Sequence, residues 1–201
     1  MTEQEKLKKI LSCAGKSLKR KWKTYLEISS GTVTQTVNQI GTVVNLVSHI
    51  PSDVKTVLVV GSGDGTEMEL LKQKGLEIKG ITISPKEVNC AKRKGLDVRL
   101  MDMHQIKFKP KSFDMIFTKD CFKQAMSPVI VWGELTNIAR KYILISEPDN
   151  RWEMRMHNYL LLTKRQFKVL AEKFGWELIK FWKINQGYVE QRNFLFKYKY
   201  A

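Results

Sequence analysis

The stretch Val57–Glu67, VLVVGSGDGTE, decides the fold of this 201-residue chain. A β-branched run typical of a buried strand ends in three alternating glycines, and a helix pattern follows at once. Glycines at such a turn let the backbone bend sharply and approach a ligand without a Cβ in the way. The N-terminus of the following helix offers unpaired N–H groups to an anionic or polar ligand. The stretch therefore predicts a strand, a ligand-binding turn and a helix.

The spacing of these glycines differs from the dinucleotide fingerprint G-x-G-x-x-G. The third glycine, Gly65, comes one residue early, and no acidic residue ends the next predicted strand. A Gly-rich turn also joins strands to helices in proteins that bind nothing there, so a purely structural turn stays open as the alternative.

Outward from this loop, short apolar runs alternate with amphipathic helix patterns. The predicted strands are Thr56–Val60, Ile78–Ile83, Asp97–Met101, Phe113–Thr118, Tyr142–Ser146, Glu177–Ile184 and Asn193–Tyr200. The predicted helices are Glu67–Lys74 and three that begin at Ser84, Ser127 and Thr163, with capping boxes at Ser84/Glu87 and Thr163/Gln166. This order predicts an α/β fold: a doubly wound, mostly parallel sheet with helices on both faces and an antiparallel C-terminal strand pair.

Residues 1–50 show no strand pattern and predict a helical extension, with the main domain at 51–201. An apolar stripe runs from Leu7 to Leu26 opposite a lysine-rich face, and a second runs from Val33 to Val47. The first helix suits a lid packed over a cleft, a nucleic-acid contact or an anionic membrane surface. Lid packing is the favoured hypothesis because the stripe must be buried somewhere.

Charge is the unusual feature of the composition. Thirty-five Lys and Arg against 20 Asp and Glu give a net charge of +15, which favours anionic partners such as nucleic acid. Three cysteines exclude a disulfide scaffold, and no apolar run reaches the length of a membrane span. The polar N-terminus is no secretory signal, so a cytoplasmic location is expected. No metal site is predicted, and the oligomeric state stays undecided.

Four segments together resemble the class I S-adenosylmethionine-dependent methyltransferases. They are VLVVGSGDG at 57–65, GITIS at 80–84, LMDMHQIKF at 100–108 and FDMIFTKD at 113–120. The resemblance covers about residues 55–184 and implies a Rossmann-like fold, S-adenosyl-L-methionine as cofactor and methyl transfer to an acceptor.

The resemblance also implies site residues. In that family the Gly-rich loop holds the methionine end, the end of the second strand meets the ribose, and an acid after the third strand meets the adenine amino group. The end of the fourth strand faces the transferred methyl. Carried onto this sequence, the cofactor residues are Gly61, Ser62, Gly63, Asp64, Gly65, Thr82, Ile83, Asp102, Met103, Thr118 and Lys119.

Two departures from the family pattern support an alternative function. Val59 stands where an acid is often found, and Thr82 replaces the usual ribose-binding acid. The alternative is a methyltransferase-fold protein that has lost catalysis and serves as a nucleic-acid-binding or assembly subunit.

The acceptor side is predicted less sharply, as either a small molecule or a nucleic acid. The catalytic candidates are Asp120 after the fourth strand, and His157 and Tyr159 in the segment after the fifth strand. That segment can instead be a structural connection whose aromatic side chains fill the core. His104, two residues after Asp102, is a second candidate for the base, with a loop histidine as the favoured interpretation. Five lysines near the predicted cleft favour a polyanionic or phosphorylated acceptor: Lys107, Lys109, Lys111, Lys119 and Lys123.

Overall fold

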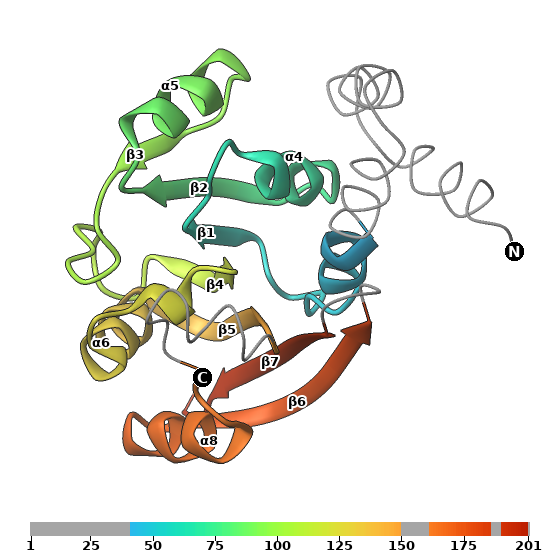
Figure 1. The fold of residues 1–201 in the computed structure, drawn as a ribbon, viewed down its shortest axis with the longest axis vertical. Helices are drawn as coiled ribbons and strands as arrows, with labels where there is room; N and C mark the ends of the chain where they lie inside the picture. Colours follow the sequence, from blue (N-terminus) through green and yellow to red (C-terminus); the bar gives the residue numbers. More distant parts are fainter. Residues whose placement is uncertain (1–40, 150–160, 186–189, 201) are drawn as a thin grey trace, which may run out of the picture.

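Seven strands form one mixed sheet in the computed structural model, which describes residues 41–149, 161–185 and 190–200 (Figure 1). The strand order is β3-β2-β1-β4-β5-β7-β6. The bounds are β1 Thr56–Val60, β2 Glu77–Thr82, β3 Val98–Leu100, β4 Phe113–Lys119, β5 Ala139–Pro148, β6 Trp176–Asn185 and β7 Glu190–Tyr198. The first five strands are parallel, and β7 is antiparallel to both β5 and β6. The predicted sheet is confirmed.

The position of β1 defines where a ligand can bind. It pairs with β2 on one side and β4 on the other, so that Val60 lies beside both Ile81 and Thr118. The chain order runs toward β3 on one side of β1 and toward β5 on the other. In doubly wound sheets ligands bind at such a switch point, outside the carboxyl ends of the strands.

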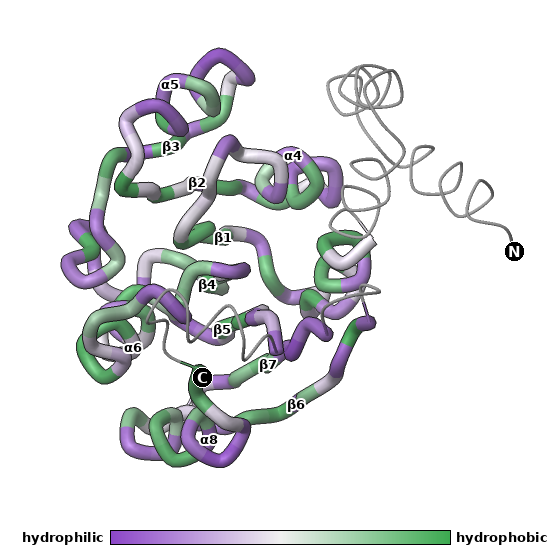
Figure 2. Tube along the Cα trace, viewed as in Figure 1, coloured by the Kyte–Doolittle hydropathy of each residue, from purple (hydrophilic) through white to green (hydrophobic). Residues whose placement is uncertain are grey.

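Helices cover both faces of the sheet, as predicted. Apolar side chains of α4 (Thr66–Gln73), α5 (Pro85–Arg93) and a helical segment at 41–48 share one core cluster. Those of α6 (Pro128–Ile138), α8 (Lys164–Lys173) and the short 3₁₀ helix η1 (Phe122–Gln124) share the other. In Figure 2, β1, β4 and β5 are largely green, whereas α5 and α8 carry purple stretches. The sequence did not predict η1.

The last ten residues of the predicted N-terminal extension pack on the sheet. Leu46 is completely buried, and Trp182 of β6 donates its indole N–H to Asn45 at 2.9 Å. The His49 ring stacks on the same indole with 4.3 Å between centroids. The predicted lid helix lies outside the described residues and stays a prediction. Within the part of the chain that the structure describes, no helix is long and apolar enough to cross a membrane.

Two predicted capping boxes have different outcomes. The one on α8 is confirmed, because Thr163 accepts from the Gln166 N–H while the Gln166 side chain accepts from the Thr163 N–H. At α5 only half forms: Ser84 accepts from the Glu87 N–H at 3.4 Å. The Glu87 carboxylate accepts instead from the Thr82 hydroxyl at 2.6 Å, so that half of the prediction is wrong.

Candidate functional site

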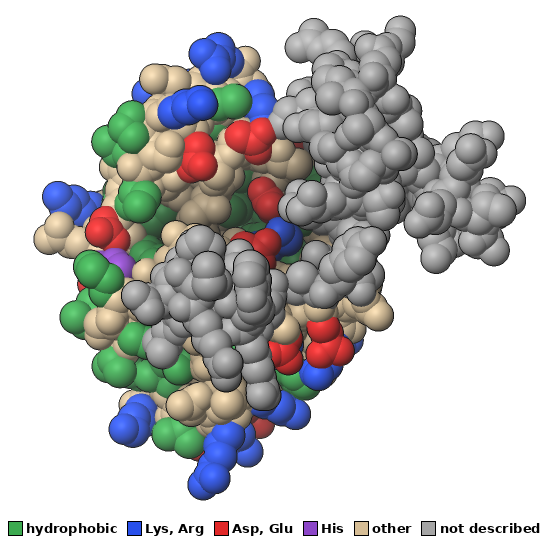
Figure 3. Space-filling view, viewed as in Figure 1, with side chains coloured by type: hydrophobic (Ala, Val, Ile, Leu, Met, Phe, Trp, Pro, Cys, Tyr) green, Lys and Arg blue, Asp and Glu red, His purple; other side chains and the backbone are tan. Residues whose placement is uncertain are grey.

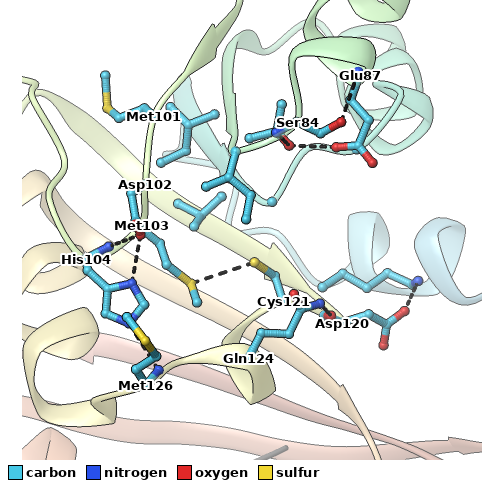
Figure 4. A pocket seen from close by; sticks show the side chains of 17 residues that line it. Ser84, Glu87, Met101, Asp102, Met103, His104, Asp120, Cys121, Gln124 and Met126 are labelled. Atoms are coloured by element: carbon cyan, nitrogen blue, oxygen red, sulfur yellow. Dashed lines mark hydrogen bonds and ion pairs between the residues drawn. The ribbon is translucent and has the colours of Figure 1, made fainter. Parts of the chain in front are cut away.

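A cavity of about 540 Å³ opens at the carboxyl ends of β1, β2 and β4 (Figure 4). This volume falls in the range of roughly 300–1,000 Å³ typical of small-molecule and cofactor sites. Its walls come from the Gly-rich loop, the start of α5, the loop after β3 and the segment after β4. Figure 3 shows acidic side chains gathered around the hollow on this face.

Two glycines of the loop line the cavity. Gly61 and Gly63 both have positive φ, +74° and +52°, which disfavours residues with a side chain. A Cβ on Gly61 would overlap the side chain of Cys121, whereas a Cβ on Gly63 would meet nothing within 4 Å. The first glycine therefore permits close packing of two loops, and the second faces open space suited to a ligand.

The other predicted loop residues lie outside the cavity lining and shape the turn. Ser62 is completely buried, and its N–H donates to Ile81 of β2 at 3.0 Å. Asp64 accepts from the N–H of Thr66 at 3.1 Å at the start of α4. Gly65, at φ +84°, leaves room for Leu96, whose side chain a Cβ there would overlap.

The end of β2 and the start of α5 line the cavity together, with Thr82 and Ile83 at the strand end and Glu87 on the helix. Thr82 is 6% exposed, and its hydroxyl donates to Glu87 and accepts from the Ser84 N–H at 3.2 Å. Ile83 is 69% exposed, so its side chain is free to cover a flat ligand. Sequence analysis missed Glu87 because its spacing from Ser84 matches a capping box. The Glu87 carboxylate therefore lies at the end of β2, where the sequence itself has threonine in place of the usual acid.

The loop after β3 places Asp102 and Met103 in the cavity wall. One oxygen of Asp102 accepts from the N–H of His104 at 2.8 Å and from its Nδ1 at 2.7 Å. These bonds lower the pKa of Asp102, so it carries a negative charge at neutral pH. The chemistry of Asp102 suits it to accept a hydrogen bond from an exocyclic amino group, and its role in cofactor binding stays a prediction.

The end of β4 brings Lys119 and Asp120 to the cavity, whereas Thr118 is buried beneath it. Lys119 pairs with Asp120 and lies 3.8 Å from the Glu67 carboxylate on α4. Burial alone would lower the pKa of Lys119, but the two acids hold it above its ordinary value. Burial raises the pKa of Glu67, while Lys119 counteracts the shift. The ammonium is therefore already neutralised by protein acids.

Asp120 is held from three directions. Its backbone is in the left-handed region at φ 56°, with its N–H bonded to Ser146 of β5 at 2.9 Å. One carboxylate oxygen accepts from the Gln191 side chain at 2.8 Å and the other from Lys119. Gln191 also donates to the Ser146 hydroxyl, which donates to Asn193 at 2.7 Å. This network, absent from the sequence analysis, fixes the predicted catalytic candidate at the cavity edge.

A second carboxyl group, Glu147, lies at the end of β5 with 2% of its surface exposed. Burial, together with the nearby Asp120 charge, raises the pKa of Glu147 to about 8. Lys123 and the N–H groups of Phe122 and Lys123 act in the opposite direction. Glu147 is thus mostly protonated at pH 7. The sequence offered no signal for this beyond its place at the end of a strand.

The structure describes only some of the residues that were predicted for the acceptor side. His157 and Tyr159 lie outside the described residues, so their catalytic roles stay predictions. Of the five lysines expected near the cleft, only Lys119 lines the large cavity. Lys111, for example, donates to the Thr136 carbonyl at 3.0 Å and lies over the Tyr198 ring at 4.4 Å. Lys119 is thus the one member of this group that contributes to the cavity lining within the described residues, and the preference for a polyanionic acceptor stays a prediction.

Replacing Lys119 by methionine is expected to lower the free energy of unfolding by about 2–3 kcal/mol. Breaking a buried ion pair costs about 3–5 kcal/mol, and the 37% exposure of the Asp120 side chain places this case lower. Urea unfolding at pH 7 measures the change. Lys86→Met, on the exposed side of α5, is the control and should change stability by less than about 0.5 kcal/mol. Equal losses for both variants would contradict the ion-pair argument.

A Gly-rich turn and a switch-point cavity with two carboxylates in its wall define an α/β protein with a site of the kind that binds nucleoside-containing cofactors. Residues 58–142 match the family model described as a methyltransferase domain. The described residues share the Rossmann-like fold of solved methyltransferases, and the matched segment lies within the region that resembles the class I S-adenosylmethionine-dependent methyltransferases in sequence.

Individual proteins similar to this chain extend the comparison. Norajmaline N-methyltransferase of Rauvolfia serpentina is 32% identical over 94 residues, 42% of this chain. The match spans about a third (32%) of the length of that relative. Magnesium protoporphyrin IX methyltransferase from Synechocystis, with bound S-adenosylhomocysteine, has a TM-score of 0.71 at 15% identity, covering 85% of this chain and 87% of that one. Geranyl diphosphate C-methyltransferase from Streptomyces coelicolor has a TM-score of 0.70 at 9% identity and covers 80% of both chains.

Proposed function

We propose that this protein transfers the methyl group of S-adenosylmethionine to a small organic acceptor. One observation carries the proposal: a single cavity is lined by Gly61 and Gly63, by the carboxylates of Glu87 and Asp102, and by Asp120. When bound, the cofactor supplies a sulfonium methyl group that a nucleophile attacks while a neutral thioether leaves. The protein then contributes mainly orientation and exclusion of water.

Each wall of the cavity suits one part of the cofactor. The open backbone at Gly63 takes the methionine end, and the Glu87 carboxylate, positioned by Thr82, accepts hydrogen bonds from the ribose hydroxyls. Asp102 accepts from the adenine amino group. The exposed side chain of Ile83 and that of Met103 supply apolar surface for the base.

The acceptor is proposed to be neutral or cationic at its reacting end. The end of β4 presents Asp120, with Glu67 close by, against a lysine that is already paired. These acids would repel a phosphate, so the net charge of +15 describes the surface and not this cavity. The relative that methylates norajmaline at nitrogen is in keeping with an amine acceptor. Asp120 is placed to take a proton from such an amine.

Calorimetric titration with S-adenosylhomocysteine tests the cofactor part of this proposal. We expect micromolar binding that falls about 10- to 100-fold in Asp102→Asn, because a hydrogen bond to a charged acceptor contributes about 1.5–3 kcal/mol. Asp97→Asn is the matched control, since that exposed carboxylate makes only surface ion pairs of 3.8–3.9 Å outside the cavity.

Absence of binding by the wild-type protein, with none co-purified, would contradict the proposal and favour the non-catalytic alternative. If binding is found, radiolabelled methyl transfer follows with three probes: tryptamine, indole-3-acetate and tRNA. Methylation of the amine is expected, whereas methylation of tRNA alone would overturn the proposed acceptor class.

A further inference from the structure

The His104 imidazole bridges two walls of the cavity (Figure 4). Its Nδ1 lies 2.7 Å from the Asp102 carboxylate, and its Nε2 lies 3.1 Å from the backbone nitrogen of Met126. Asp102 belongs to the loop after β3, and Met126 to the segment between β4 and α6. One side chain therefore joins segments that follow two different strands.

The chemistry of the two partners defines the tautomer. A backbone N–H can only donate, so Nε2 must keep its lone pair and accept from Met126. The proton of the neutral ring is then on Nδ1 and donates to the Asp102 carboxylate. Both ring nitrogens are satisfied in this single arrangement.

This arrangement decides which Asp102 oxygen meets a ligand. The N–H and Nδ1 of His104 both bond the same oxygen, Oδ1. The other oxygen is left to accept a hydrogen bond, and the two bonds hold its direction. Without them, a side chain that is 55% exposed would sample other rotamers. The same bonds lower the pKa of Asp102 and keep it an acceptor.

The Met126 bond holds the opposite wall. Met126 is 87% exposed, so packing contributes little to its position, yet it lines the cavity together with Gln124. The hydrogen bond to Nε2 links this segment directly to the loop that carries Asp102, beside a 3.8 Å contact between the Cys121 Sγ and the Met103 Sδ. A change at His104 would therefore disturb base recognition through Asp102 and the distance between the walls.

We propose that His104 is a positioning residue that sets the selectivity of the site for an adenine base over bases without the exocyclic amino group. The inference rests on the proposed function. His104 need not touch the cofactor, because it acts through the Asp102 carboxylate that accepts from the amino group.

The test compares binding of S-adenosylhomocysteine and S-inosylhomocysteine by calorimetry. The inosyl compound has a carbonyl oxygen where adenine has its amino group. We expect the wild type to prefer the adenosyl ligand by at least about tenfold, because an unpaired carboxylate facing a carbonyl is costly. His104→Ala should reduce that preference about tenfold. His104→Asn, whose amide N–H mimics Nδ1–H, should keep most of it. His104→Gln, whose carbonyl mimics Nε2, should lose it.

Glu87→Gln is the matched control, because it weakens the ribose end and should lower both affinities by the same factor. Thermal unfolding of each variant checks that the fold is intact. Equal losses of both ligands in His104→Ala, with the preference unchanged, would overturn the positioning role and leave the proposed function standing. If the wild type binds neither ligand, the proposed function fails and this inference fails with it.

Discussion

Glu147→Gln is expected to stabilise the protein at pH 9 and to change it little at pH 5. Burial raises the pKa of Glu147 from the usual 4.5 to about 8. A carboxyl group with a raised pKa in the folded state holds its proton there after the unfolded chain has lost it. The contribution of Glu147 to the free energy of unfolding is therefore largest below pH 4.5 and falls as the pH rises toward 8. At about 1.4 kcal/mol for each pH unit, the total loss is about 4–5 kcal/mol.

Urea unfolding at several pH values from 5 to 9 measures this effect. The wild type should lose stability across the range, and Glu147→Gln should remove most of that slope because glutamine carries no charge to bury. Glu172→Gln on the exposed face of α8 is the control, since its carboxylate is 48% exposed beside Lys168. If the free energy of unfolding has the same pH dependence in the wild type and in Glu147→Gln, ionisation of Glu147 does not destabilise the folded protein.

The fold could be predicted from the sequence because its signals are local. The β-branched run at Thr56–Val60 forms β1 with the predicted bounds, and the glycines after it have the positive φ that their turn requires. Thr163 and Gln166 form a capping box because both partners lie within one helical turn. Such features need no knowledge of what packs against them.

The missed site residues depend on side-chain contacts that a sequence pattern does not specify. Glu87 has the spacing of a capping residue, but its carboxylate accepts from the Thr82 hydroxyl, and the Ser84 N–H donates to that same hydroxyl oxygen. Gln191 reaches Asp120 because β7 pairs with β5 in a register that sets Asn193 beside Ser146. Period-two alternation identifies a strand but carries no register, so the support of Asp120 could not be predicted.

Gly61→Ala is expected to lower the free energy of unfolding by about 2–5 kcal/mol and to weaken S-adenosylhomocysteine binding at least tenfold. Left-handed backbone at φ +74° costs an alanine about 1–2 kcal/mol. The added methyl group also overlaps the Cβ and Sγ of Cys121, and overpacking of this kind costs about 1–3 kcal/mol. Because Cys121 lines the cavity too, relief of the overlap moves a cavity wall. Urea unfolding and calorimetry measure the two effects.

Gly75→Ala separates the two costs. Gly75 has φ +83° with nothing within 4 Å of the position of its Cβ, so this variant should lose only the 1–2 kcal/mol, roughly, of backbone strain and keep its ligand affinity. In the double variant Gly61→Ala/Cys121→Gly, the overlapping atoms are gone, and ligand binding should recover relative to Gly61→Ala alone. If the double variant binds S-adenosylhomocysteine no better than Gly61→Ala does, the close approach of the two loops does not shape the cavity. Glycine at position 61 is then required only for the backbone conformation of the turn.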